Sequence, residues 1–245
     1  MANNISLKSL TAIVTGGGSG IGEGVALMLA WEGANVVICG RRVASLERVR
    51  ASIAAQGGSG LAVQADVSDA DDAQNVVRAA VEAFGTVDIL VNNAAVDGGG
   101  LIHEHSIEEW DRIIATNLRG PFLMARAVLP LMRAQQRGHI INISSESGLE
   151  HYEGDGAYGV SKHALNALGE YIQRENQALN IRVDTICPGM VVTEMTRDSR
   201  GLDHSKCLYP EDIAELARWL LTRRPNVKIG TPVLIQTMEN PWEST

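Results

Sequence analysis

Short runs rich in Val and Ile alternate with amphipathic segments along most of the chain. Such continuous apolar runs are typical of strands that helices cover on both faces of a parallel sheet. They predict strands at 11–15, 35–39, 61–64, 88–93, 139–144, 181–187 and 232–236. The segments between them predict helices from Ile21, through Leu46 and Val49, over 69–84, 107–136 and 158–179, and over 211–221 after Pro210. The sequence therefore predicts an α/β fold with a doubly wound, seven-stranded parallel sheet and helices on both faces.

No internal repeat, low-complexity segment or Pro- or Ser-rich linker divides the chain. We therefore expect one domain over residues 1–245. The longer irregular stretches, 94–106, 146–156 and 189–209, all follow predicted strands. Ligands of such sheets bind beyond the carboxyl ends of the strands, so these stretches predict one active face, with 189–209 as a substrate loop.

Composition narrows the classes of partner. The 245 residues are 45% hydrophobic and 20% charged, with a net charge of −8 and a pI near 5.3. This acidic balance argues against nucleic acid and anionic membrane surfaces. No apolar run approaches the roughly 18 residues of a spanning helix, and the first residues show no secretory signal. Three cysteines without a C-x-x-C pair fit a reducing compartment, so we expect a cytoplasmic protein.

The segment TGGGSGIG, residues 15–22, follows the first predicted strand and opens the first predicted helix. Glycines permit a tight turn and close approach to the backbone, while the helix N-terminus offers unpaired N–H groups to a phosphate. This context predicts a Rossmann-type dinucleotide site, the alternative being a glycine-rich turn without a ligand. The residues that we expect at the cofactor are Gly16, Ser19, Gly20, Ile21 and Gly22.

The end of the second predicted strand bears on which nicotinamide dinucleotide binds. An acidic residue there would hold the 2′-hydroxyl of the adenine ribose. The chain instead places Gly40 there, followed by Arg41 and Arg42, and arginine suits a 2′-phosphate. We therefore predict NADP as the cofactor. NAD stays possible, because the two arginines could also begin a solvated helix.

Tyr158 and Lys162 lie four residues apart at the start of a predicted helix, so both side chains share one helix face. A nearby ammonium favours the phenolate and would lower the pKa of the tyrosine. The pair thus predicts a general acid or base at Tyr158.

Together these segments resemble the short-chain dehydrogenase/reductase family from about residue 7 to 194. The resemblance rests on the glycine loop, ADV at 65–67, NNA at 92–94, TNLRG, INISSESG, YGVSK and PGMVVT, in the family's order. Ser145 is preferred to Ser144 because it lies thirteen residues before Tyr158, the family's usual separation. The cofactor residues that the resemblance adds are Asp66, Val67, Asn93, Ala94, Pro188, Gly189, Val191 and Thr193.

The resemblance also implies a catalytic set of Asn117, Ser145, Tyr158 and Lys162. Ser145 would hydrogen-bond the substrate oxygen and Tyr158 would exchange a proton with it. Lys162 would hold the nicotinamide ribose and depress the pKa of the tyrosine, and Asn117 would steady a water between Lys162 and solvent. The implied activity interconverts a carbonyl compound and its alcohol, in a homodimer or homotetramer.

Three features depart from the family pattern. Ala95 replaces a usual glycine, and Asp184 stands where many relatives have Asn. The C-terminal segment from Gly230 lacks the family's common ending, which leaves open how the substrate pocket is closed.

Acidic residues are frequent between Ser145 and Tyr158. They could favour a polar or cationic substrate over a carboxylate, or form a solvated acidic rim. These residues are Glu146, Glu150, Glu153 and Asp155. His103 and His105 lack a third ligand at a familiar spacing, so we predict no metal site.

The sequence as a whole predicts an NADP-dependent oxidoreductase with a small carbonyl or alcohol substrate. An NAD-dependent alcohol dehydrogenase of the same fold is the main alternative. A catalytically silent nucleotide-binding scaffold is a further one, but a scaffold would not need Ser145, Tyr158 and Lys162 together.

Overall fold

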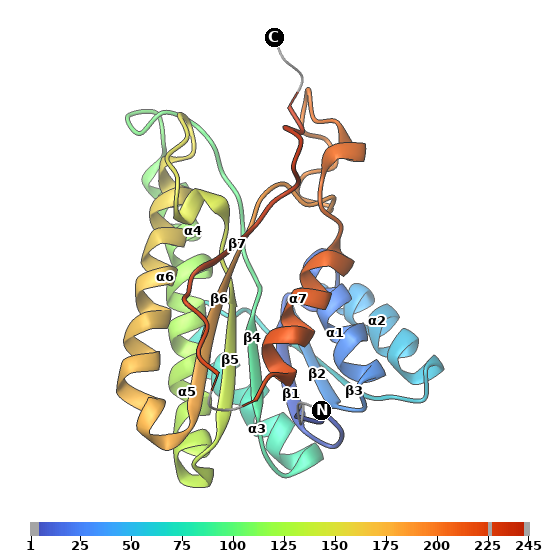
Figure 1. Ribbon diagram of the computed structural model, residues 1–245. Coiled ribbons are helices and arrows are strands. Elements are labelled where there is room, and N and C mark those ends of the chain that lie inside the picture. Colours follow the sequence, from blue (N-terminus) through green and yellow to red (C-terminus); the bar gives the residue numbers. More distant parts are fainter. Residues whose placement is uncertain (1–4, 225–226, 243–245) are drawn as a thin grey trace.

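Seven parallel strands form one sheet in the computed structural model, which describes residues 5–224 and 227–242 (Figure 1). Neighbouring strands follow the order β3-β2-β1-β4-β5-β6-β7, and each neighbouring pair is parallel. The predicted sheet is thereby confirmed, although the predicted range 1–245 extends past the described residues. The strands are β1 (Thr11–Thr15), β2 (Asn35–Gly40), β3 (Ser59–Gln64), β4 (Ile89–Asn92), β5 (Gly138–Ile143), β6 (Ile181–Pro188) and β7 (Val233–Ile235).

Helices cover both faces of the sheet. One face carries α1 (Gly20–Trp31), α2 (Val43–Ala55) and α7 (Pro210–Thr222). The other face carries α3 (Ala70–Phe84), α5 (Gly120–Gln135) and α6 (Gly156–Asn176), with α4 (Ile107–Ile114) leading into α5. The loops that follow β4 and β6 both project beyond the carboxyl edge of the sheet, on opposite sides of the top of Figure 1.

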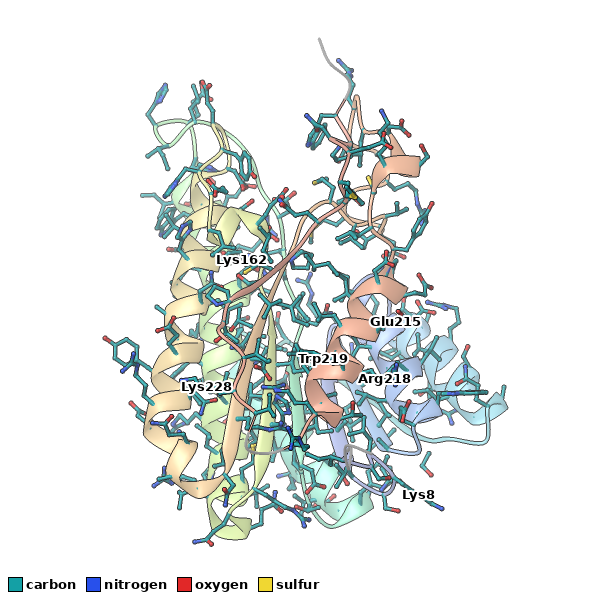
Figure 2. The ribbon with its side chains drawn as sticks, in the orientation of Figure 1. Lys8, Lys162, Glu215, Arg218, Trp219 and Lys228 are labelled. Carbon is teal, nitrogen blue, oxygen red and sulfur yellow. The ribbon has the colours of Figure 1, made fainter. Side chains whose placement is uncertain are left out.

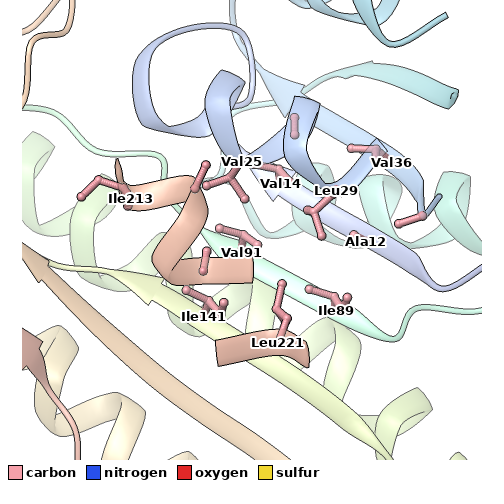
Figure 3. Close-up of a cluster of buried hydrophobic side chains, with 14 of the residues drawn as sticks. Ala12, Val14, Val25, Leu29, Val36, Ile89, Val91, Ile141, Ile213 and Leu221 are labelled. Carbon is pink, nitrogen blue, oxygen red and sulfur yellow. The ribbon is translucent and has the colours of Figure 1, made fainter. Parts of the chain in front are cut away.

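The period-two alternation of the strands divides the core between the two faces. On β1, Ala12 and Val14 join the cluster under α1 and α7, whereas Ile13 joins the cluster under α3 and α5. Figure 3 shows the first cluster, in which Val25 of α1 and Leu221 of α7 meet the strand side chains. All five of these side chains are almost wholly buried, which is why the strands read as continuous apolar runs.

Local sequence signals set several helix ends. The Asp69 carboxylate accepts from the backbone N–H groups of Asp71 and Asp72 and so caps α3, which ends at Gly85 with φ +85°. Pro210 occupies the first turn of α7. The predicted helix over 107–136 is interrupted, because a π turn spans Ala115–Arg119 between α4 and α5.

A buried ionic network explains the unusual aspartate of β6. Asp184 Oδ2 lies 2.6 Å from His139 Nε2 and 2.9 Å from Arg223 Nη2. Arg182 Nη2 donates to His139 Nδ1 at 3.0 Å, so Nδ1 is an acceptor and the imidazole is neutral, with its proton on Nε2. Asp184 therefore supplies the negative charge that balances the buried Arg223, which an asparagine would not do.

This network predicts a pH-dependent stability. Burial lowers the pKa of His139 from 6.5 to about 4, with Arg182 and Arg223 adding to the effect of burial against the Asp184 carboxylate. The unfolded chain therefore binds more protons at this site between those two pH values, and stability is lost as the pH falls through that window. We expect the free energy of unfolding to drop by up to about 1.4 kcal/mol per pH unit there. Free energies of unfolding, measured by urea titration at several pH values across this window, should depend less steeply on pH in His139→Gln than in wild type or in the exposed-site variant His151→Gln. Equal slopes in all three proteins would contradict the assignment.

Candidate active site

Thr15 and Asn93 tie together the carboxyl ends of β1 and β4. Asn93 Nδ2 donates to the Thr15 carbonyl at 2.9 Å. The Thr15 hydroxyl oxygen accepts from the backbone N–H groups of Asn93 at 2.9 Å and Ala94 at 3.0 Å. The order of strands along the sheet reverses between β1 and β4, and ligands of open α/β sheets bind at such a reversal.

The glycine loop above this joint forms a cradle without side chains. Gly16 and Gly20 have φ values of +64° and +54°, which side chains rarely allow. A Cβ on Gly22 would lie 2.4 Å from the Gly16 carbonyl oxygen, so α1 packs directly against the loop. Ser19 makes no side-chain cap to α1, whose first residues line the adjoining groove. A helix N-terminus left open beside such a cradle fits a pyrophosphate group.

A groove of about 330 Å³ runs along the carboxyl edge from the glycine loop to Tyr158 and Lys162. Most of the predicted cofactor residues line it. They are Gly16, Ser19, Gly20, Ile21, Arg41, Arg42, Asp66, Val67, Asn93, Ala94, Tyr158, Lys162 and Thr193.

The other predicted cofactor residues lie elsewhere. Gly22 is buried behind the loop, whereas Pro188, Gly189 and Val191 line a second cavity of about 390 Å³. Ser145 lines this second cavity, and Ser144 lines both. Tyr158 also belongs to the walls of both cavities, so its side chain lies where the two spaces meet.

Asp66 is held in the wall of the groove, close to Arg41. Its carboxylate accepts from the Ser68 hydroxyl at 2.7 Å and the Ser68 backbone N–H at 3.0 Å. Burial alone would raise the pKa of Asp66, but these bonds and the charge of Arg41 outweigh it and hold the pKa below its usual value. The carboxylate is therefore ionised and fixed in position.

Lys162 reaches the carboxyl edge from α6, far from Lys8 and Lys228 (Figure 2). Its Nζ donates to the Ile143 carbonyl at 3.0 Å and lies 5.3 Å from the centre of the Tyr158 ring. Burial lowers the pKa of Lys162 to about 8, with the charges of Cys187 and Asp97 opposing it.

The expected depression of the tyrosine pKa is not found in this arrangement. Burial raises the pKa of Tyr158, and the Asp97 carboxylate raises it further, while the Ser145 hydroxyl acts in the opposite direction. The physical reason is that Lys162 lies over the ring while its ammonium hydrogen-bonds a carbonyl oxygen, so desolvation dominates the phenol.

Asn117 lies at the centre of the π turn and is fully buried. Its side chain donates to the Val96 carbonyl at 2.9 Å and accepts from the Val96 N–H at 2.8 Å. It also donates to Ser161 Oγ at 3.1 Å. Asn117 thus holds the loop after β4 against α6. Its contact on α6 is Ser161, which directly precedes Lys162 in the sequence. A π turn of this kind often marks a functional site.

Carboxylates dominate the charge of the second cavity. Asp97, Glu146 and Asp155 line it, together with Tyr152. Burial raises the pKa of Asp155, the Ser147 hydroxyl lowers it, and the charges of Asp97 and Glu146 raise it again. Because three carboxylates line the cavity and no Lys, Arg or His side chain of the described residues does, its electrostatic potential is negative.

The segment after β7 closes the second cavity. Trp242 lines that cavity and forms an antiparallel bridge with Leu202. The Asp203 N–H donates to the Pro241 carbonyl at 2.8 Å, and the Thr237 hydroxyl donates to the Lys206 carbonyl at 2.8 Å. The atypical C-terminal segment therefore forms a wall beside the substrate loop, as far as residue 242; residues 243–245 lie outside the described part.

Among the residues of these cavities, the sequence did not single out Asp97, Glu194 and Trp242, although Asp97 and Glu194 lie in stretches that were predicted to border the active face. Asp97 follows the NNA motif closely and Glu194 follows PGMVVT directly, so extending each motif by a few residues would have included both. Nothing local marks Trp242, because its place depends on the pairing with Leu202.

No helix among the described residues is long and apolar enough to cross a membrane. No group of three or more His, Cys, Asp or Glu side chains within residues 5–224 and 227–242 is placed to hold a metal ion.

Comparison with known proteins gives the class of this molecule. The model of the short chain dehydrogenase family matches residues 10–202. An uncharacterized oxidoreductase of Staphylococcus aureus (strain MRSA252) is 36% identical over 224 residues, covering 91% of this chain and 96% of the relative. One of Staphylococcus epidermidis is 32% identical with the same coverage. The crystal structure of levodione reductase superposes with a TM-score of 0.83 at 28% identity, covering 88% of this chain and 91% of that one.

The chain belongs to the short-chain dehydrogenase/reductase family and is a dehydrogenase or reductase enzyme. Members of this family use NAD or NADP, act on small molecules and typically form oligomers.

Proposed function

We propose that this enzyme interconverts a carbonyl compound and its alcohol with NADP(H), through Ser145, Tyr158, Lys162 and Asn117. The observation that carries the proposal is the position of Tyr158, which belongs to the walls of both the dinucleotide groove and the second cavity. A proton donor at that boundary can reach an oxygen bound in the second cavity while the cofactor lies in the groove.

Each residue has a defined task in the reduction. The nicotinamide supplies the hydride, and the protein positions the substrate and stabilises charge. Negative charge develops on the carbonyl oxygen, to which Ser145 and Tyr158 donate hydrogen bonds. The raised pKa of Tyr158 keeps the phenol protonated until that charge develops. Lys162, whose pKa of about 8 leaves it mainly cationic at neutral pH, favours transfer of the phenol proton.

Tyr158→Phe tests this chemistry. Loss of the hydroxyl should lower kcat by at least about a thousandfold, because proton transfer to the substrate oxygen is removed. The Kd of NADP+ should change less than about threefold, since the ring and Lys162 remain. Steady-state rates and calorimetric titration measure the two effects, with Tyr171→Phe, at an exposed position of α6 outside both cavities, as the matched control. Near-normal turnover in Tyr158→Phe would refute the proposed mechanism.

The preference for NADP rests on the end of β2. Gly40 occupies the place where an acid would hold the ribose hydroxyl of NAD, and Arg41 and Arg42 follow in the groove wall. Arg42 is paired with Glu194, whereas the charge of Arg41 acts on Asp66 at the adenine end. We therefore propose Arg41 as the main partner of the 2′-phosphate, with the already paired Arg42 as the second arginine of the groove wall.

Arg41→Ala should weaken NADP+ binding about tenfold and leave NAD+ binding within about twofold, because only NADP+ carries the phosphate. Calorimetric titration of both cofactors against wild type, Arg41→Ala and the distant surface variant Arg78→Ala measures this difference. Wild-type protein that binds NAD+ as tightly as NADP+, with no effect of Arg41→Ala, would favour the NAD-dependent alternative.

The substrate that we propose is neutral or cationic. Within the described residues the second cavity is lined by three carboxylates and by no Lys, Arg or His side chain. A carboxylate on the substrate would be repelled there and would have no charged partner. Glu146 and Asp155, two of the four acidic residues noted in the sequence, line this cavity and favour a substrate preference over a merely solvated rim.

A pair of substrates of matched shape tests this preference. A ketone bearing a neutral ester should show a kcat/KM about tenfold or more above that of the corresponding keto acid. Asp97→Asn should lower the ratio of kcat/KM for the ester to kcat/KM for the keto acid, because it removes one carboxylate from the cavity. Asp111→Asn, on an exposed position of α4, should leave this ratio unchanged. A keto acid turned over as efficiently as its ester would contradict the preference.

A further inference from the structure

We propose that Glu194 competes with the cofactor 2′-phosphate for Arg42 and thereby limits how strongly this enzyme prefers NADP. The inference rests on the proposed cofactor site and adds a specificity-determining residue from the substrate loop. Its evidence is a contact between that loop and the arginine at the start of α2.

The contact is an ion pair at the rim of the dinucleotide groove. Arg42 Nη2 lies 2.7 Å from Glu194 Oε2 and donates to Ser19 Oγ at 3.0 Å. Ser19, Arg42 and Glu194 all line the groove. One guanidinium nitrogen thus joins the glycine loop, the start of α2 and the loop after β6.

The loop after β6 approaches this rim closely. The Thr193 Cγ2 lies 3.2 Å from the position that a Cβ on Gly20 would occupy, so the loop rests on the glycine loop itself. Glu194 follows Thr193 directly, and this proximity places its carboxylate over Arg42. The pairing with Arg42 lowers the pKa of Glu194 despite the opposing effect of burial, so the carboxylate is ionised at working pH.

The pair matters for recognition more than for folding. Its two side chains are 61% and 48% exposed, and ion pairs at such exposure stabilise a fold little. A phosphate brought to Arg42 would either displace the Glu194 carboxylate or lie beside it, like charge against like charge. Both outcomes weaken the phosphate contact relative to an unpaired guanidinium.

NAD+ presents a neutral hydroxyl at this position, which does not compete with the Glu194 carboxylate for Arg42. The ion pair can then persist, and with it the tether from the substrate loop to α2. Glu194 should therefore penalise NADP+ and not NAD+. Arg48, which donates to the Gly18 carbonyl of the glycine loop, is paired in the same way with Glu23 at 2.6 Å, so a second arginine beside that loop is also neutralised by an acid.

The test is a titration of NADP+, NAD+ and adenosine 2′,5′-bisphosphate against Glu194→Gln by calorimetry. The amide keeps the size of the side chain and removes its charge. We expect the two phosphate-bearing ligands to bind about fivefold more tightly and NAD+ to change less than about twofold, with the gain shrinking at high ionic strength. Glu82→Gln is the matched control, because Glu82 forms an exposed ion pair with Arg78 on α3, outside the groove.

A double variant locates the effect. In an Arg42→Ala background, Glu194→Gln should produce only a small part of the increase in NADP+ affinity that it produces in the wild-type background. Unchanged NADP+ affinity in Glu194→Gln, an equal gain for NAD+, or the full gain without Arg42 would each overturn the inference. The proposed cofactor fails on a different result, namely wild-type protein that binds NAD+ as tightly as NADP+; a selective gain in Glu194→Gln would still establish the role of Glu194.

Discussion

The joint between β1 and β4 fixes the position of the active face. Asn93 donates to the Thr15 carbonyl through its side chain and to the Thr15 hydroxyl through its backbone N–H. These two bonds join the ends of β1 and β4, where the strand order reverses. The same amide fills the space behind the glycine loop. A Cβ on Gly16 would lie 2.9 Å from Asn93 Nδ2, and one on Gly22 would lie 2.5 Å from it. The residue that ties the strands therefore also explains why glycine is needed at two loop positions.

Burial controls the electrostatics of Tyr158 and Lys162, the proposed catalytic pair. It raises the pKa of Tyr158 and lowers that of Lys162, so it favours the neutral form of both groups. Neighbouring polar groups partly offset the free-energy penalty of burying a charge. The Ile143 carbonyl accepts a hydrogen bond from Lys162, and the Ser145 hydroxyl favours the phenolate of Tyr158. The side chains of Asp97 and Ser145 thus act on the pKa of Tyr158 in opposite directions, so the loop after β4 influences the protonation of the phenol.

The sequence predicted what depends on local patterns. Continuous runs rich in Val and Ile identified the seven strands, and the glycine loop could be recognised because it lies between a strand and a helix. Depth of burial was not readable, so the spacing of Tyr158 and Lys162 predicted a lowered tyrosine pKa where desolvation raises it. Asp184 had no explanation until the chain brought Arg223 beside it, 39 residues further along. Such pairings depend on tertiary packing, which single-sequence patterns do not encode.

The π turn at Ala115–Arg119 links the candidate site to the phase of a whole helix. A π turn contains one residue more than the α-helical turn it replaces, and each residue advances an α-helix by about 100°. The apolar side chains Leu123, Met124 and Val128 of α5 face the core with that offset included. Losing one residue from the turn would rotate this apolar face away from the sheet. The position of Asn117 in the π turn and the orientation of the apolar face of α5 are therefore set by the same local insertion.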